Sequence, residues 1–252
     1  MAVSNAPPPY SYQAISQDEE GQFAAEDSDA YKFGETVEQS DPEIRAMFIR
    51  KVYAVLFVQL LGTALVAGAM TTSSATAWLQ NNMWFMLIPL VGSFASLAAL
   101  YWKSTSHPLN LFLLGLFTLM ESLSVGMLVS VMDRGLVLKA VCLTTFLFAA
   151  LSLFTLQTKY DFGSLGSVLY YGLMVMIGTG FVQLFLPYNH LFELGYSVLA
   201  CVLFSGYILF DTYQIQQRMS PDMWVLANVS LYLDVINLFI SILRVLNSTS
   251  DE

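Results

Sequence analysis

Charged residues are scarce in this chain of 252 residues. Asp, Glu, Lys and Arg together make up 12% of it, about half of the roughly 25% found in an ordinary soluble domain. Hydrophobic residues make up 56%, and the mean hydropathy is +0.60. This composition excludes an ordinary soluble protein and indicates an integral membrane protein in contact with the lipid bilayer.

Basic residues are also few, and no basic cluster suggests a nucleic-acid partner. The formal charge of −9 comes from the first 44 residues, which hold ten acids and a single base, Lys32. The remaining residues hold nine acids and nine bases. We therefore predict a disordered, acidic, proline-containing cytosolic tail over 1–44 and a transmembrane domain over 45–252.

Cysteine and histidine occur only at Cys142, Cys201, His107 and His190. The cysteines lie in apolar runs without metal-binding spacing, which indicates small hydrophobic residues within helices. The histidines fall between apolar runs, and the sequence has no HExxH motif, no intramembrane histidine pair and no Ser–His arrangement. We therefore expect neither an enzyme nor a bound cofactor.

Seven apolar runs come close to the ~20 residues that a helix needs to cross a bilayer. Backbone amides in lipid must be satisfied within the segment, so each run predicts a helix and the fold class is an all-α bundle of seven spans. The seventh run has enough polar residues to suit a re-entrant or bundle-enclosed helix as well. The runs are 48–70, 84–102, 109–131, 136–156, 165–186, 194–213 and 224–246.

Lys and Arg near the ends of the spans predict the orientation, because cytosolic loops carry an excess of them. One set of loops carries six: Arg45, Arg50, Lys51, Lys103, Lys159 and Arg218. The opposite set carries three: Arg134, Lys139 and Arg244. This bias predicts a cytosolic N-terminus.

The tail contains a short proline motif. Pro7, Pro8, Pro9 and Tyr10 spell P-P-x-Y, a pattern whose polyproline II conformation fits the aromatic grooves of WW domains. A WW-domain ubiquitin ligase controlling trafficking or turnover is the partner that this motif predicts. The alternative is a low-complexity tail that happens to contain prolines.

Three carboxylates fall within the apolar runs: Glu121, Asp211 and Asp234. Around Asp234 polar residues recur at steps of four, three, four and three, so they share one helix face that should point toward other helices or water. That stripe consists of Ser230, Asp234, Asn237, Ser241 and Arg244. Interhelical hydrogen bonding explains the serines and the asparagine. It explains an aspartate less well, because Asn or Ser would bond at a lower desolvation cost.

Two stretches, "GYILFDTYQI" and "SLYLDVINLFISILRVL", resemble the C-terminal signature of the transmembrane Bax inhibitor motif family, also called lifeguard proteins. "IRAMFIRKVYAVLFVQL" is similar to the opening of the eukaryotic lifeguard branch, and "HPLNLFLLGLFTLMES" to its entry into the third span. The resemblance covers about residues 44 to 248. It implies seven helices, with the last one enclosed by the other six.

The resemblance also implies a function: a pH-sensitive calcium leak in an endomembrane (endoplasmic reticulum, Golgi, vacuole or lysosome) that suppresses cell death. Its proton-sensitive aspartate pair maps onto Asp211 and Asp234, which would also hold calcium transiently as the permeant ion. Lys103 is the candidate for a basic latch, although lysine lacks the bidentate fork of arginine. Glu121, with Asn237 and Ser230, would line the pathway.

A mechanism follows if Asp211 and Asp234 come within hydrogen-bonding range. Repulsion in a low dielectric disfavours ionisation of both carboxyls, so one proton is retained between them. Sharing it would hold the sixth and seventh helices together, whereas losing it would leave two hard oxygen ligands for calcium. Either protonation state can be the closed one.

A non-conducting scaffold accounts for the same residues. In that alternative the aspartates only stabilise the bundle. The protein would then regulate apoptosis by binding Bcl-2-type death regulators or a WW-domain ubiquitin ligase.

Overall fold

The computed structural model describes residues 36–37, 40–187 and 189–250. Nearly all of the predicted tail, including Pro7, Pro8 and Tyr10, lies outside the described residues. The first described helix begins at Pro42, so the last three residues assigned to the tail are helical.

The described part of the chain is all-helical. Its elements are α2 (Pro42–Met70), α3 (Ser73–Asn81), η1 (Met83–Met86), α4 (Leu87–Trp102), α5 (Leu109–Ser130), α6 (Arg134–Gln157), α7 (Leu165–Gln183), α8 (His190–Gln217), η2 (Pro221–Met223) and α9 (Trp224–Ser250). Seven helical segments among these residues are long and apolar enough to cross a membrane. They coincide with the seven predicted runs, which confirms the fold class.

The short helix α3 was not predicted. Its sequence, "SSATAWLQN", is too short and too polar to resemble a span. The helix is held by packing, because the Trp78 ring meets Phe85 edge-on at a centroid distance of 5.1 Å.

Local sequence explains several helix boundaries. Pro42 occupies the first turn of α2, where its missing N–H costs nothing. Asp133 caps α6, since its Oδ1 accepts hydrogen bonds from the amides of Gly135 and Leu136. Asn189 caps α8 in the same way through the amide of Phe192, at 3.1 Å.

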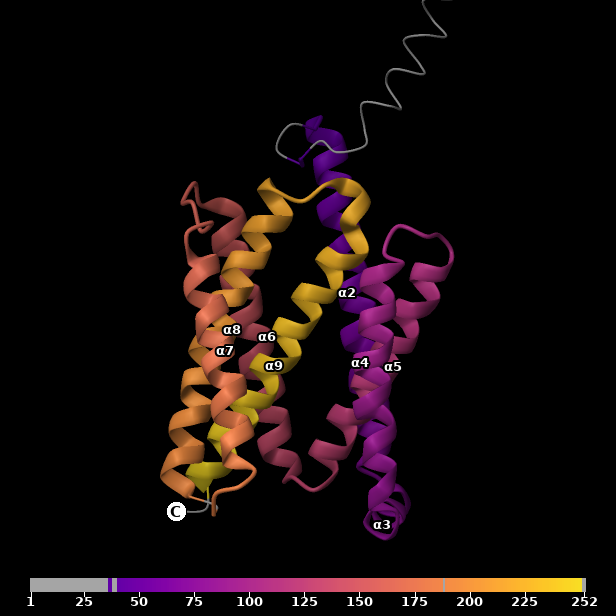
Figure 1. Ribbon diagram of the computed structural model, residues 1–252, viewed down its shortest axis with the longest axis vertical. Helices are drawn as coiled ribbons and strands as arrows, with labels where there is room; N and C mark the ends of the chain where they lie inside the picture. Colours follow the sequence, from indigo (N-terminus) through magenta and orange to yellow (C-terminus); the bar gives the residue numbers. More distant parts are fainter. Residues whose placement is uncertain (1–35, 38–39, 188, 251–252) are drawn as a thin grey trace, which may run out of the picture. The chain divides into compact units, whose positions relative to one another are not determined.

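The long helices form two groups on either side of α9 (Figure 1). In one group α5 packs against α2 and α4, and in the other α8 packs against α6 and α7. Helix α9 runs obliquely between the groups and packs against α2, α5, α6 and α8 (Figure 1). It is therefore the element that joins them.

Helix α9 is also the most deeply buried span. Of its most apolar window 61% is buried, against 6% for α7. Leu231, Tyr232, Leu238 and Leu243 are each fully buried. The expectation that the last helix lies inside the bundle is confirmed, and at 27 residues it extends about 40 Å, enough to cross a bilayer.

Polar contacts tie α9 to the group of α2 and α5. The hydroxyl of Tyr232 hydrogen-bonds to that of Thr63 on α2, at 2.9 Å, and Thr63 also accepts from Ser122 on α5, at 3.0 Å. The side-chain amide of Asn228 donates to the carbonyl of Val52, at 3.1 Å. Because all these groups are buried, the bonds fix the position of α9 against this group.

Tyr232→Phe removes one of these bonds while keeping the aromatic packing. We expect a loss of about 1 kcal/mol in the free energy of unfolding, the usual contribution of such a bond. Reversible unfolding in bicelles measures it. Tyr171→Phe, at a tyrosine that is 68% exposed on α7, is the matched control. Equal free energies of unfolding for the two variants would show that the Tyr232 hydrogen bond does not stabilise the position of α9.

Candidate functional site

Asp211 and Asp234 lie on neighbouring helices that pack along their length. Asp211 is six residues before the end of α8 and Asp234 ten residues after the start of α9, so the connection at η2 folds them back beside one another. Their carboxyl groups are close enough to interact directly. Asp234 is 6% exposed, and its Oδ2 has no hydrogen-bond partner among the described residues.

Both aspartates line a cavity of about 690 Å³. Residues of α4, α5, α7, α8 and α9 form its wall, so it lies between the two helix groups on one side of α9. Its volume falls in the usual range for binding sites, about 300–1,000 Å³. The polar stripe of α9 lines it in full: Ser230, Asp234, Asn237, Ser241 and Arg244.

Glu121 also lines this cavity, from α5, and lies near Ser93 of α4. The three acids proposed from sequence therefore share one cavity, and Asn237 and Ser230 share it with them. Lys103 does not. It is exposed at the end of α4, with its Nζ 5.9 Å from the centroid of the Trp102 ring, and it is absent from the cavity wall.

The base that lines the cavity is Arg244 on α9. Sequence reasoning placed Arg244 on the polar stripe without giving it a role. It also missed Tyr207, which lies one turn before the predicted Asp211 on α8 and shares the cavity wall. The signal was available, because Ala200, Phe204, Tyr207 and Asp211 recur at steps of four, three and four.

The cavity wall is acidic, with three carboxyl groups and one guanidinium. A recess lined mainly by one sign of charge attracts the opposite ion. No group of three or more His, Cys, Asp or Glu side chains with metal-binding geometry occurs in the described residues. Since calcium takes 6–8 oxygens, Asp211 and Asp234 suit transient contact with a partly hydrated cation better than tight storage.

A second acidic feature lies outside the spans, in the loop between α6 and α7. The Tyr213 hydroxyl, the Gly163 amide and the guanidinium of Arg218 together hold the pKa of Asp161 below its usual value. Oδ1 of Asp161 lies 3.8 Å from Nη2 of Arg218, and both side chains are largely exposed. Such a surface pair contributes little to stability, and it is separate from the cavity.

The fold and the cavity define a class: a seven-span membrane protein whose buried last helix contributes an acidic group to a cavity that holds three carboxyl groups. The sequence model described as "Inhibitor of apoptosis-promoting Bax1" matches residues 45–251. The chain belongs to this Bax inhibitor family, as its C-terminal motifs suggested.

Three similar proteins have names that fit this family. Bax inhibitor 1 of Schizosaccharomyces pombe (strain 972 / ATCC 24843) is 37% identical over 247 residues, which cover 97% of this chain and 90% of the relative. Protein lifeguard 4 of Mus musculus and the Golgi anti-apoptotic protein of vaccinia virus (strain Lister) are each 37% identical over 225 residues, covering 89% of this chain and 94% of each relative. The chain is thus an integral membrane protein of an anti-apoptotic family, whose relatives are named as regulators rather than enzymes.

Charged and polar side chains in a span should face water or one another, so the cavity wall should be reachable from water. In a background with Cys142 and Cys201 replaced by Ala, Ser230→Cys should react with a charged, water-soluble methanethiosulfonate. Phe146→Cys, at a position 70% exposed on α6 and facing lipid, is the control and should stay unmodified. An inert Ser230→Cys would show that the cavity is closed to water.

Proposed function

We propose that the protein is a pH-sensitive calcium leak of an intracellular membrane, with Asp211 and Asp234 as its gate. The observation that carries this proposal is the placement of both carboxyl groups, side by side, on the wall of one acidic cavity. A carboxylate buried in a span costs about 2.5–3.5 kcal/mol or more. If the side chain only had to form a hydrogen bond, Asn or Ser would form it at a lower desolvation cost.

The chemistry follows from the proximity of the two acids. Two carboxylates this close in a low dielectric do not both ionise readily, so the pair retains one proton. Calcium competes with that proton, because its ligands must be deprotonated. Proton loss at this point changes both the contact between α8 and α9 and the affinity for the ion.

Other cavity residues complete the pathway. Glu121 on α5 gives a passing cation a further carboxylate, and Ser230 and Asn237 supply neutral oxygens along α9. Arg244 lies at the other end of the stripe, on the last turns of α9. There its fixed positive charge limits how far a cation is stabilised along the cavity. We assign the role of basic residue to Arg244 in place of Lys103.

In the cell, such a leak lowers stored calcium and thereby suppresses cell death. We place the protein in an endomembrane, with its N-terminus in the cytosol, as the loop charges indicate. Membership of an anti-apoptotic family and the name of the Golgi relative support this placement.

The alternative is a non-conducting scaffold that suppresses cell death by binding Bcl-2-type regulators or a WW-domain ubiquitin ligase. The Pro7–Tyr10 motif favours it. The two functions differ in one measurable property, which is ion flux through the purified protein.

Purified protein in liposomes that contain a calcium dye tests the proposal. Calcium influx should exceed that of empty liposomes and change with pH. Asp211→Asn and Asp234→Asn should each change the flux about tenfold, which corresponds to about 1.4 kcal/mol of barrier height, and should flatten its pH dependence.

Asp222→Asn is the matched control, because Asp222 is exposed in η2 and does not line the cavity. Its flux should equal that of the unmodified protein. If folded protein gives no flux above empty liposomes, the leak is refuted and the scaffold becomes the better account.

A further inference from the structure

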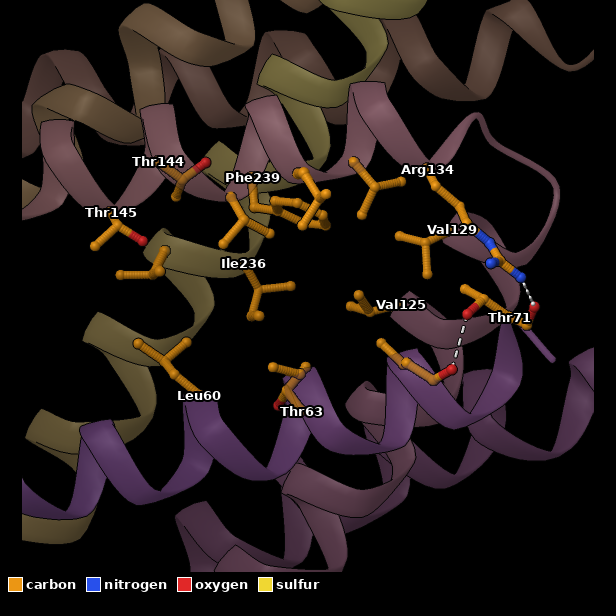
Figure 2. Close-up of a pocket in the computed structure, with 17 residues that line it drawn as sticks. Leu60, Thr63, Thr71, Val125, Val129, Arg134, Thr144, Thr145, Ile236 and Phe239 are labelled. Atoms are coloured by element: carbon orange, nitrogen blue, oxygen red, sulfur yellow. Dashed lines mark hydrogen bonds between the residues drawn. The ribbon is translucent and has the colours of Figure 1, made fainter.

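A second cavity, of about 520 Å³, lies on the other side of α9 (Figure 2). Figure 2 shows α2 and α6 facing each other across it, with Ile236 and Phe239 of α9 and Val125 and Val129 of α5 between them. Its lining is mostly aliphatic, with four threonines and Arg134, and it holds no acid, in contrast to the acidic cavity. The calcium pathway proposed above runs through the acidic cavity and does not include this second one.

The cavity is a groove with a buried floor and an exposed rim. Val125, Val129 and Phe239 on the floor are each at most 8% exposed. On the rim, Leu138 and Val141 of α6 are 66% and 44% exposed, and Ala64 and Gly68 of α2 are exposed as well. Since these rim residues lie within membrane spans, the groove opens sideways into lipid.

The length of the groove matches one leaflet. It extends from Leu60 to Thr71 on α2 and from Arg134 to Thr145 on α6. At 1.5 Å per residue each stretch covers roughly 16 Å. Half of a hydrocarbon core of about 30 Å is about 15 Å.

One end of the groove carries a positive charge. Arg134, in the first turn of α6, donates a hydrogen bond from Nη2 to the carbonyl of Thr71, at 3.2 Å (Figure 2). A guanidinium has five N–H donors, and Arg134 makes no ion pair with another described residue. The neighbouring Asp133 is engaged with the amides that begin α6.

We propose that this groove binds one acyl chain of an anionic phospholipid, with Arg134 holding the phosphate. The aliphatic walls accept the chain, the opening between α2 and α6 admits it from the bilayer, and the length places its headgroup at the membrane surface beside Arg134. The groove is thus a lipid site, separate from the acidic cavity on the opposite face of α9.

Photoactivatable lipids test this with the full-length protein in phosphatidylcholine vesicles. Phosphatidylglycerol and phosphatidylcholine, each with a diazirine in one acyl chain, are compared by mapping the labelled peptides. Labelling should concentrate on 60–71 and 134–145. The anionic probe should be favoured about fivefold, the effect expected of one basic residue at a membrane surface.

Gly68→Phe should abolish most of this labelling by filling the groove. A Cβ at Gly68 meets no atom within 4 Å, so there is open space where the side chain would begin. Gly62→Phe is the control, because a Cβ at Gly62 also meets no atom within 4 Å and Gly62 lies outside the groove. Leu138→Trp on the rim is a second blocking variant if Gly68→Phe does not elute as a folded protein.

Arg134→Gln should keep the labelling but reduce the preference for the anionic probe to near one. Lys139→Gln, at an exposed base of α6 outside the groove, should leave that preference unchanged. Equal labelling by both lipids in the unmodified protein, or unchanged labelling in both blocking variants, would overturn the proposal. Crosslinks between two copies of the chain through the groove would assign it to a dimer contact and overturn it as well.

Discussion

The burial of α9 is the constraint on which the rest of this structure depends. A polar group on a helix inside a bundle needs a polar partner or water, because neither lipid nor packed apolar side chains supply one. On one side Asn228 and Tyr232 find theirs on α2. On the other side Asp234 meets Asp211 and a polar cavity. Helix α9, which joins the two groups, therefore also carries the buried acid Asp234.

The two faces of α9 have opposite chemistry. One borders an acidic cavity between α4, α5, α7 and α8, and the other borders an aliphatic groove between α2 and α6. Ile236 contributes to both walls. Because the two helix groups meet chiefly through α9, a change in its packing is felt on both sides. The proposed ion site and the proposed lipid site therefore share one helix.

Much of this could be predicted from sequence, because span length and the steps of four and three around Asp234 are local properties. The cavity wall follows that stripe from Ser230 to Arg244. That Lys103 lies outside the cavity could not be predicted, because its position depends on how separate helices pack. The groove could not be predicted either, because the small residues Ala64 and Gly68 on α2 are equally typical of close packing against another helix. Helix α3 was not predicted, because it has nine residues and packs through the contact between Trp78 and Phe85.

The most direct test of the central claim counts the protons released when calcium binds. Protein in nanodiscs, in lightly buffered solution with a pH dye, is titrated with calcium. If the pair of Asp211 and Asp234 exchanges its proton for the ion, calcium binding releases protons, and Asp234→Asn abolishes the release. Calcium binding without proton release, or an equal release from Asp234→Asn, would contradict the account.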